Sequence, residues 1–100
     1  MLPQAELDRF TDAIERGDCL LLDVRERREY EAGHLPNARS MPLSQLEIWT
    51  SELDKERLLI LYCRSGHRAR RCAEALSARG FRHVRVLDGG YSAWSARPPK

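Results

Sequence analysis

Cys63 stands where an apolar run gives way to a short loop that contains glycine. The run Leu58–Tyr62 precedes it, the loop Arg64–Arg68 follows, and a helical pattern begins directly afterwards. In a strand–loop–helix arrangement of this kind, the backbone N–H groups of the loop and of the first helical turn point at the cysteine sulfur. They favour the thiolate, which is the nucleophilic form of the side chain. The spacing therefore predicts a nucleophilic cysteine in an exposed loop whose N–H groups hold the anionic group that the sulfur attacks or carries.

The other two cysteines are predicted to be packing residues. Cys19 begins a predicted buried strand, and Cys72 lies on the apolar face of the helix that follows the loop. The alternative for Cys72 is a role as a resolving thiol. The 3 cysteines contain no C-x-x-C pair and fit no small disulfide framework. Cys63, His67 and Cys72 match no common zinc framework, so we expect no metal site, and attack by a thiolate needs no organic cofactor.

Charge is divided unevenly along the chain. Residues 1–57 hold 8 Lys/Arg and 13 Asp/Glu, whereas residues 58–100 hold 9 Lys/Arg and 2 Asp/Glu. The basic part contains the Cys63 loop, which favours a small anionic ligand or an acidic partner surface there. Five of its arginines are interpreted first as a solvated face: Arg70, Arg71, Arg79, Arg82 and Arg85. No aromatic residues alternate with them, so nucleic acid is not an expected partner.

The chain has 100 residues, which is enough for one small domain. Its longest apolar run, Leu58–Cys63, is far shorter than a membrane span, so no membrane partner is expected. The first residues include Glu6, Asp8 and Arg9 and contain no signal-type apolar region. Taken as the natural start, they predict a cytoplasmic protein.

Predicted strands and helices alternate along the chain. Helices are expected over about residues 4–16, over Arg25–Glu31, from a capping Ser44 to about Leu53, from the loop to Gly80, and around Tyr91 and Trp94. Strands are expected at Cys19–Val24, at Leu58–Tyr62, at Val84–Leu87 and near Ser40, and Pro98–Pro99 close the pattern. This order predicts an α/β fold with a parallel sheet covered on both faces. The carboxyl ends of the strands then bring Asp23–Arg25, Cys63–Arg68 and Asp88–Gly90 to one edge.

Arg68 lies in the first turn of a predicted helix, where the helix dipole disfavours a cation. We therefore expect it to pair with a carboxylate, and Asp23 at the end of the neighbouring strand is the candidate. Alternatively, Asp23 caps the helix that follows its strand. The two roles, pairing with Arg68 and capping that helix, do not exclude each other. His67 is interpreted as lining the loop, because a thiolate needs no general base, and His34 as a structural residue bonded to loop backbone. Trp49 and Trp94 are interpreted as packing residues.

Three segments of the chain resemble the single-domain rhodaneses, a family of thiosulfate-type sulfurtransferases. They read LLLDVRERREYEAGHLPNARSMPL, LILYCRSGHRA and GFRHVRVLDGGYSAW, follow the family's order and cover nearly the whole chain. The resemblance implies one rhodanese domain over residues 1–100, with a central five-stranded parallel sheet and flanking helices. The chain departs from the family at Ala69, where a serine often follows the loop.

The resemblance also implies a mechanism. Cys63 would accept a sulfane sulfur as a persulfide and pass it to cyanide or a thiol. The residues implied around the sulfur and its substrate are Arg64, Ser65, Gly66, His67 and Arg68. Asp23 and Arg25 are expected to support them, because they follow the neighbouring strand at the same edge of the predicted sheet. The implied partners are thiosulfate or a persulfide as the small anionic donor, and a protein is one option for the acceptor.

Two other functions stay open. In the first, the chain is a sulfur carrier or regulatory binding module, and the basic segment 68–85 docks a protein partner. In the second, it is a cysteine phosphatase or arsenate reductase. Those phosphatases have the pattern C-x5-R, whereas this chain has C-x4-R, with Ala69 at the position of their arginine. The shorter loop suits one sulfur atom better than a tetrahedral phosphoryl group.

Overall fold

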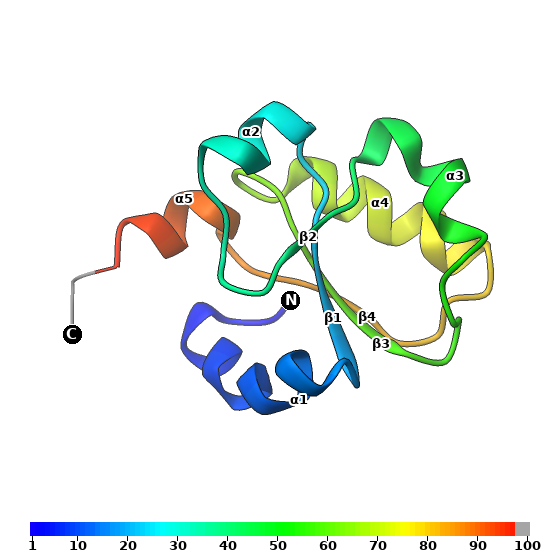
Figure 1. Ribbon diagram of the computed structural model, residues 1–100, viewed down its shortest axis with the longest axis horizontal. Coiled ribbons are helices and arrows are strands. Elements are labelled where there is room, and N and C mark those ends of the chain that lie inside the picture. The colour runs from blue at the N-terminus through cyan, green and yellow to red at the C-terminus, as the bar shows by residue number, and fades with distance from the viewer. Residues whose placement is uncertain (98–100) are drawn as a thin grey trace.

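The computed structural model describes residues 1–97 and shows a parallel sheet with helices on both faces (Figure 1). The predicted α/β class is therefore confirmed, while Pro98 and Pro99 lie outside the described residues. The strands, in the order β2-β1-β3-β4, are β1 (Cys19–Asp23), β2 (Arg39–Ser40), β3 (Leu58–Tyr62) and β4 (Val84–Val86). The helices are η1 (Gln4–Phe10, 3-10), α1 (Thr11–Arg16), α2 (Arg27–Ala32), η2 (Leu43–Gln45, 3-10), α3 (Leu46–Thr50), α4 (His67–Ala78) and α5 (Gly90–Ser95).

The expected fifth strand is wrong, because the sheet of the described residues has 4 strands. A single parallel bridge, Leu2 to Leu87, stands in its place beside the end of β4. The Leu2 N–H donates to the Val86 carbonyl at 2.8 Å, and the Asp88 N–H donates to the Leu2 carbonyl at 2.8 Å. Pairing stops there because Pro3 has no N–H to donate and η1 begins at the next residue.

Alternate residues of β1 and β3 point to opposite faces of the sheet. One face packs on α3 and α4 through Leu20, Leu22, Leu59, Leu61 and Cys63 with Trp49, Ala69, Cys72 and Leu76. The other packs on η1, α1 and α5 through Cys19, Leu21, Ile60 and Tyr62 with Leu7, Ile14, Tyr91 and Trp94. Cys63 and Tyr62 therefore leave the end of β3 in opposite directions. The packing interpretation of Trp49 and Trp94 is confirmed, and the Trp49 indole also donates to the Pro42 carbonyl at 2.9 Å.

Two helix predictions need correction. Ser44 is not a helix cap, because it lies inside η2 and its hydroxyl donates to the Glu26 carboxylate at 2.9 Å. The helix around Trp49 ends at Thr50 rather than at Leu53. The expected first helix is two elements, since its first part forms a 3-10 helix.

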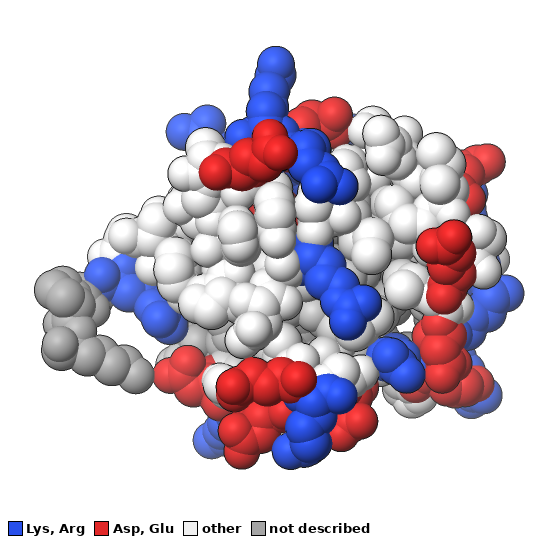
Figure 2. All heavy atoms as spheres, in the orientation of Figure 1, with Lys and Arg blue, Asp and Glu red and all other residues white. Residues whose placement is uncertain are grey.

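The charge contrast between the two parts of the chain is partly neutralised by the fold. Arg79 pairs with Glu47 at 3.0 Å, and Arg82 lies 3.8 Å from Glu56, so two of the five arginines interpreted as a solvated face have acidic neighbours from the other part. Figure 2 shows acidic side chains gathered along the lower edge of the molecule, where Figure 1 places α1. Among the described helices, none is both long and apolar enough to cross a membrane.

Candidate active site

Cys63 directly follows β3, as predicted, at the carboxyl edge of the sheet. The expectation that it lies in an exposed loop is wrong, because only 1% of the residue is accessible. Its side chain continues the alternation of Leu59 and Leu61 and points into the core toward α4. The start of α4 and the start of α5 both close over this position. The loop surface is therefore exposed at Arg64, Ser65 and His67, while the sulfur lies beneath it.

Two backbone N–H groups converge on the Cys63 sulfur. The Gly66 N–H lies 3.0 Å from Sγ, and the Ala69 N–H lies 3.3 Å from it. Gly66 precedes α4 with φ +126°, a conformation that glycine adopts most readily. The predicted contact between the loop backbone and the sulfur is thus confirmed. Because Ala69 contributes its backbone, the absence of a serine hydroxyl there leaves this contact intact.

The first turn of α5 holds the same loop from the other side. The Tyr91 N–H donates to the Cys63 carbonyl at 2.8 Å, and the Ser92 N–H donates to the Arg64 carbonyl at 3.0 Å. A Cβ on Gly90 would collide with the Cys63 carbonyl oxygen and lie 2.9 Å from that of Arg64. Gly90 is the first residue of α5, so this close approach joins two segments far apart in the sequence, and no local sequence pattern reveals it.

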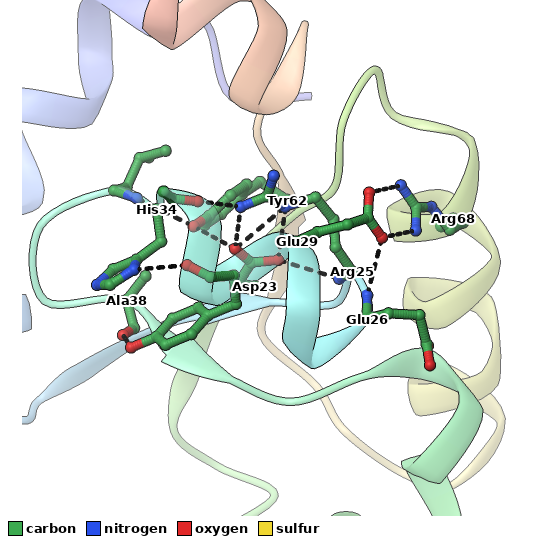
Figure 3. A network of polar contacts seen from close by, with 11 residues as sticks. Asp23, Arg25, Glu26, Glu29, His34, Ala38, Tyr62 and Arg68 are labelled. Atoms are coloured by element: carbon green, nitrogen blue, oxygen red, sulfur yellow. Dashed lines mark hydrogen bonds and ion pairs between the residues drawn. The ribbon is translucent and has the colours of Figure 1, made fainter.

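Arg68 pairs with Glu29, not with Asp23 as predicted. Its guanidinium donates to both carboxylate oxygens, at 2.7 and 3.0 Å (Figure 3). The bond from Arg68 holds the pKa of Glu29 down at about 2 and raises the pKa of Arg68. Glu29 also accepts the Glu26 N–H at 3.0 Å in the capping box of α2. Sequence reasoning missed Glu29 because it is one of several carboxylates on a charged helix.

Asp23 instead binds Arg25 and Tyr62 (Figure 3). It accepts the Arg25 backbone N–H at 3.0 Å and the Arg25 guanidinium at 2.7 Å, and both side chains are almost completely buried. The Tyr62 hydroxyl donates to Asp23 at 2.7 Å and accepts the Leu35 N–H at 3.1 Å. Burial together with the Asp23 bond raises the pKa of Tyr62. Asp23 therefore does not cap α2, whose N-cap is Glu26.

Arg25 joins this network to a surface cleft. Burial alone would lower its pKa, but the bond and charge of Asp23 outweigh burial and raise it. Its guanidinium also donates to the Gly33 carbonyl at 2.6 Å and lies 4.3 Å from the centre of the Tyr91 ring. The cleft has a volume of about 330 Å³ and lies among α2, α5 and Arg64. Arg25, Arg64 and Tyr91 thus line the same cleft beside the loop.

The remaining candidate residues lie as follows. Within the described part of the chain, Arg64 is exposed and makes no ion pair. Asp88 reaches the predicted edge through its backbone, which accepts the Gln4 side-chain amide at 2.8 Å. His34 has a structural contact, as predicted, since its Nδ1 lies 3.0 Å from the Tyr30 carbonyl and its ring stacks on Tyr30, but this backbone belongs to α2 and not to a loop.

Cys19 and Cys72 are buried packing residues, as predicted. Burial raises the pKa of Cys19 to about 11 and that of Cys72 to about 12. Neither thiol is therefore ionised to any extent near neutral pH. Over residues 1–97, no three His, Cys, Asp or Glu side chains are grouped as a metal site requires.

Comparison with known proteins places this arrangement in a family. The model of the rhodanese-like domain matches residues 6–97. The thiosulfate sulfurtransferase GlpE of Coxiella burnetii is 31% identical over 88 residues, which cover 88% of this chain and 82% of that protein. The putative sulfur carrier protein YrkF of Bacillus subtilis is 30% identical, and the match covers 96% of this chain and 52% of that protein.

A solved structure agrees with these sequence matches. The human single-domain sulfurtransferase TSTD1 superposes with a TM-score of 0.85, at 24% identity, over 99% of this chain and 97% of that one. At that level of identity the likeness concerns the fold. Together with the family model over nearly the whole length, it shows that this chain belongs to the rhodanese-like family.

Proposed function

We propose that this chain is a sulfurtransferase that carries a sulfane sulfur on Cys63. The observation that supports this most directly is the convergence of the Gly66 and Ala69 N–H groups on Sγ, at 3.0 and 3.3 Å. Such donors stabilise negative charge on sulfur and need no reorganisation as the charge develops. The function that GlpE carries in its name agrees with this chemistry. We take residues 1–100 as one rhodanese domain.

With thiosulfate as donor, the Cys63 thiolate attacks the sulfane sulfur. A bond forms between Sγ and that sulfur, the sulfur–sulfur bond of thiosulfate breaks, and sulfite leaves with the electron pair. The product is a Cys63 persulfide and no external oxidant or reductant is needed. Arg64 binds the sulfonate of the donor, because it is the exposed cation next to Cys63. In the second half-reaction, cyanide or a thiolate attacks the outer sulfur and Cys63 leaves as thiolate.

Arg68 has a positioning role in this account. Its Nη1 and Nη2 groups both bind Glu29, and these bonds fix the start of α4, which supplies the Ala69 N–H. Asp23 and Arg25 support the same edge of the sheet through their buried pair. Ser65, Gly66 and His67 complete the loop around the sulfur.

A protein-docking sulfur carrier is the second candidate. Arg70 and Arg71 are exposed near the start of α4, next to the loop, and within residues 1–97 neither makes an ion pair. Together with Arg64 they form a cationic surface suited to an acidic protein. The match to a putative sulfur carrier agrees with it. A cysteine phosphatase is disfavoured, because Arg68 is held by Glu29 and position 69 has no side chain that could bind phosphoryl oxygens.

The test is turnover with defined donors. Thiocyanate formation from thiosulfate and cyanide should depend on Cys63, and Cys63→Ser should abolish it while circular dichroism stays unchanged. Full activity in Cys63→Ser would overturn the proposal. If a protein persulfide is the working donor, thiosulfate turnover should be slow and loading by the protein persulfide fast, which would favour the carrier.

A further inference from the structure

The cleft beside the Cys63 loop contains a hydrogen-bond donor without a partner. The Nε and Nη2 atoms of Arg25 donate to the Asp23 carboxylate, and Nη2 also donates to the Gly33 carbonyl. No described residue accepts a hydrogen bond from Nη1. The Arg25 side chain is only 5% exposed. Its Nη1 atom, however, is not completely buried, and Arg25 lines the cleft. A guanidinium fixed by buried bonds and by the Tyr91 ring therefore presents one free N–H face to the cleft.

The other polar groups of the cleft are also mainly donors. Arg64 lines the cleft without an ion pair among the described residues, and Ser92 adds a hydroxyl from α5. The Ser95 hydroxyl donates its proton to the Ser92 carbonyl at 3.2 Å, so towards a ligand it acts as an acceptor. Among residues 1–97, Glu29 is the only carboxylate that lines the cleft, and both of its oxygens bind Arg68. Since Asp23 balances the charge of Arg25, Arg64 leaves the cleft with one net positive charge. The chemistry therefore fits one carboxylate.

The cleft is larger than cyanide requires. Its volume of about 330 Å³ lies at the lower end of the range for sites that bind organic molecules, about 300–1,000 Å³. Cyanide has two heavy atoms and would leave most of it empty. A small organic molecule with a carboxylate at one end and a reactive sulfur at the other would fill it. Arg64 borders both the cleft and Cys63, so the sulfur end lies toward the loop.

We infer that this cleft binds the carboxylate of the sulfur acceptor, which is a low-molecular-weight organic thiol. Arg25 Nη1 and the Arg64 guanidinium bind the carboxylate oxygens, and the α5 hydroxyls bind the polar part of the molecule. The thiolate of the acceptor attacks the outer sulfur of the Cys63 persulfide. A new sulfur–sulfur bond forms on the acceptor, the bond to Sγ breaks, and its electron pair returns to Cys63 as thiolate. This inference rests on the proposed sulfur transfer.

The test compares two acceptors that differ only in the carboxylate. Protein loaded with thiosulfate and desalted is mixed with N-acetylcysteine or with its amide, and loss of the added sulfur is followed by mass spectrometry. At equal thiolate concentration, the acid should react about tenfold faster than the amide, as a charge-assisted bond to arginine implies. Equal rates for the two acceptors would overturn the inference.

A matched pair of variants locates the effect. Ser95→Glu places a negative charge in the cleft, and Ser77→Glu places the same charge at the far end of α4. The preference for the acid should fall to about unity in Ser95→Glu and stay about tenfold in Ser77→Glu. A preference that survives in Ser95→Glu would contradict the assignment. Arg25 itself is not replaced, because that would leave Asp23 as a buried unpaired charge.

A binding measurement separates this inference from the proposed function. N-acetyl-S-methylcysteine has the carboxylate but no reactive thiol, so it can be titrated into protein that carries no added sulfur. The amide resonances of Ser92 and Ser95 should shift on binding, with a Kd about tenfold lower than for the corresponding amide probe. Absence of a difference would overturn the cleft assignment even if Cys63 carries sulfur. Failure of thiosulfate to load Cys63 would count against the proposed function alone.

Discussion

Arg68, in the first turn of α4, and Glu29, in α2, form a two-point ion pair across 39 residues of sequence, with bonds of 2.7 and 3.0 Å. The pair ties the helix that supplies the Ala69 N–H to the helix that follows β1. A cation in the first turn of a helix is disfavoured by the dipole, so the carboxylate offsets a local cost. Glu29 accepts bonds from both Nη1 and Nη2 of Arg68, which is why we propose the exposed Arg64, and not Arg68, as the cation that binds the donor.

A double-mutant cycle should measure this coupling. Arg68→Met and Glu29→Gln should each lower the free energy of unfolding, and the double variant should lose less than their sum. We expect a coupling of about 1 kcal/mol, because the pair is bidentate but about a third exposed. Urea unfolding of the four proteins gives the value, and purely additive effects would show that the contact contributes nothing.

The Arg68–Glu29 pair should also make the free energy of unfolding depend on pH in the acid range. The pKa of Glu29 is about 2 in the folded protein, against an ordinary value of 4.5. Because the pKa of Glu29 is lower in the folded protein than in the unfolded chain, the ionised carboxylate stabilises the fold above pH 4.5. This contribution disappears as the pH falls from 4.5 toward 2. The difference in unfolding free energy between the wild type and Glu29→Gln should therefore be constant above about pH 5.5 and shrink below pH 4.5. A difference that stays constant down to pH 2 would contradict the assigned pKa.

Gly90 should tolerate no side chain. It has φ +53°, and a Cβ would collide with the Cys63 carbonyl. Gly90→Ala should therefore cost about 3 kcal/mol or more, as the sum of backbone strain and steric overlap, and should reduce turnover by displacing the loop. Gly17→Ala is the matched control, because Gly17 has φ +85° with nothing within 4 Å, and it should cost only about 1 kcal/mol. Equal losses in thermal unfolding would mean that the contact with Cys63 is unimportant.

Arg64→Ala should raise KM for thiosulfate about tenfold with a smaller change in kcat. Arg64 contributes binding that is the same in the ground state and in the transition state, worth about 1.4 kcal/mol for one charged hydrogen bond. Arg85→Ala is the control, since Arg85 is also exposed and, within residues 1–97, makes no ion pair. A tenfold fall in kcat at unchanged KM would instead assign Arg64 to the transition state.

The backbone around Cys63 was predictable because the signals are local. The run Leu58–Tyr62 and the glycine at position 66 fix a strand, a tight loop and a helix in close succession, and β3 and α4 lie where they were expected. The parallel sheet followed from the alternation of strands and helices. The burial of Cys63 was not predicted, because it depends on how α4 packs on the sheet, where the Cys63 side chain lies in the core with Ala69 and Cys72.

The polar partners were the least predictable part of the site. Asp23 and Glu29 both lie near the carboxyl edge of the sheet, and sequence alone does not decide which of them Arg68 reaches. The structure decides it because Asp23 faces Tyr62 on the opposite side of the sheet from Cys63. The fifth strand that the family resemblance implies does not form beside β4 for a reason that the sequence does contain: Pro3 directly follows Leu2 and ends the pairing.

Mass spectrometry of the protein after exposure to thiosulfate tests the central claim most directly. The account predicts a gain of one sulfur atom, located by peptide mapping on Cys63 and lost on addition of cyanide. Cys19 and Cys72 should stay unmodified near neutral pH, because burial raises their pKa values to about 11 and about 12. Cys63→Ser should gain no sulfur. A sulfur found on Cys72, or a gain of mass that persists in Cys63→Ser, would contradict the account.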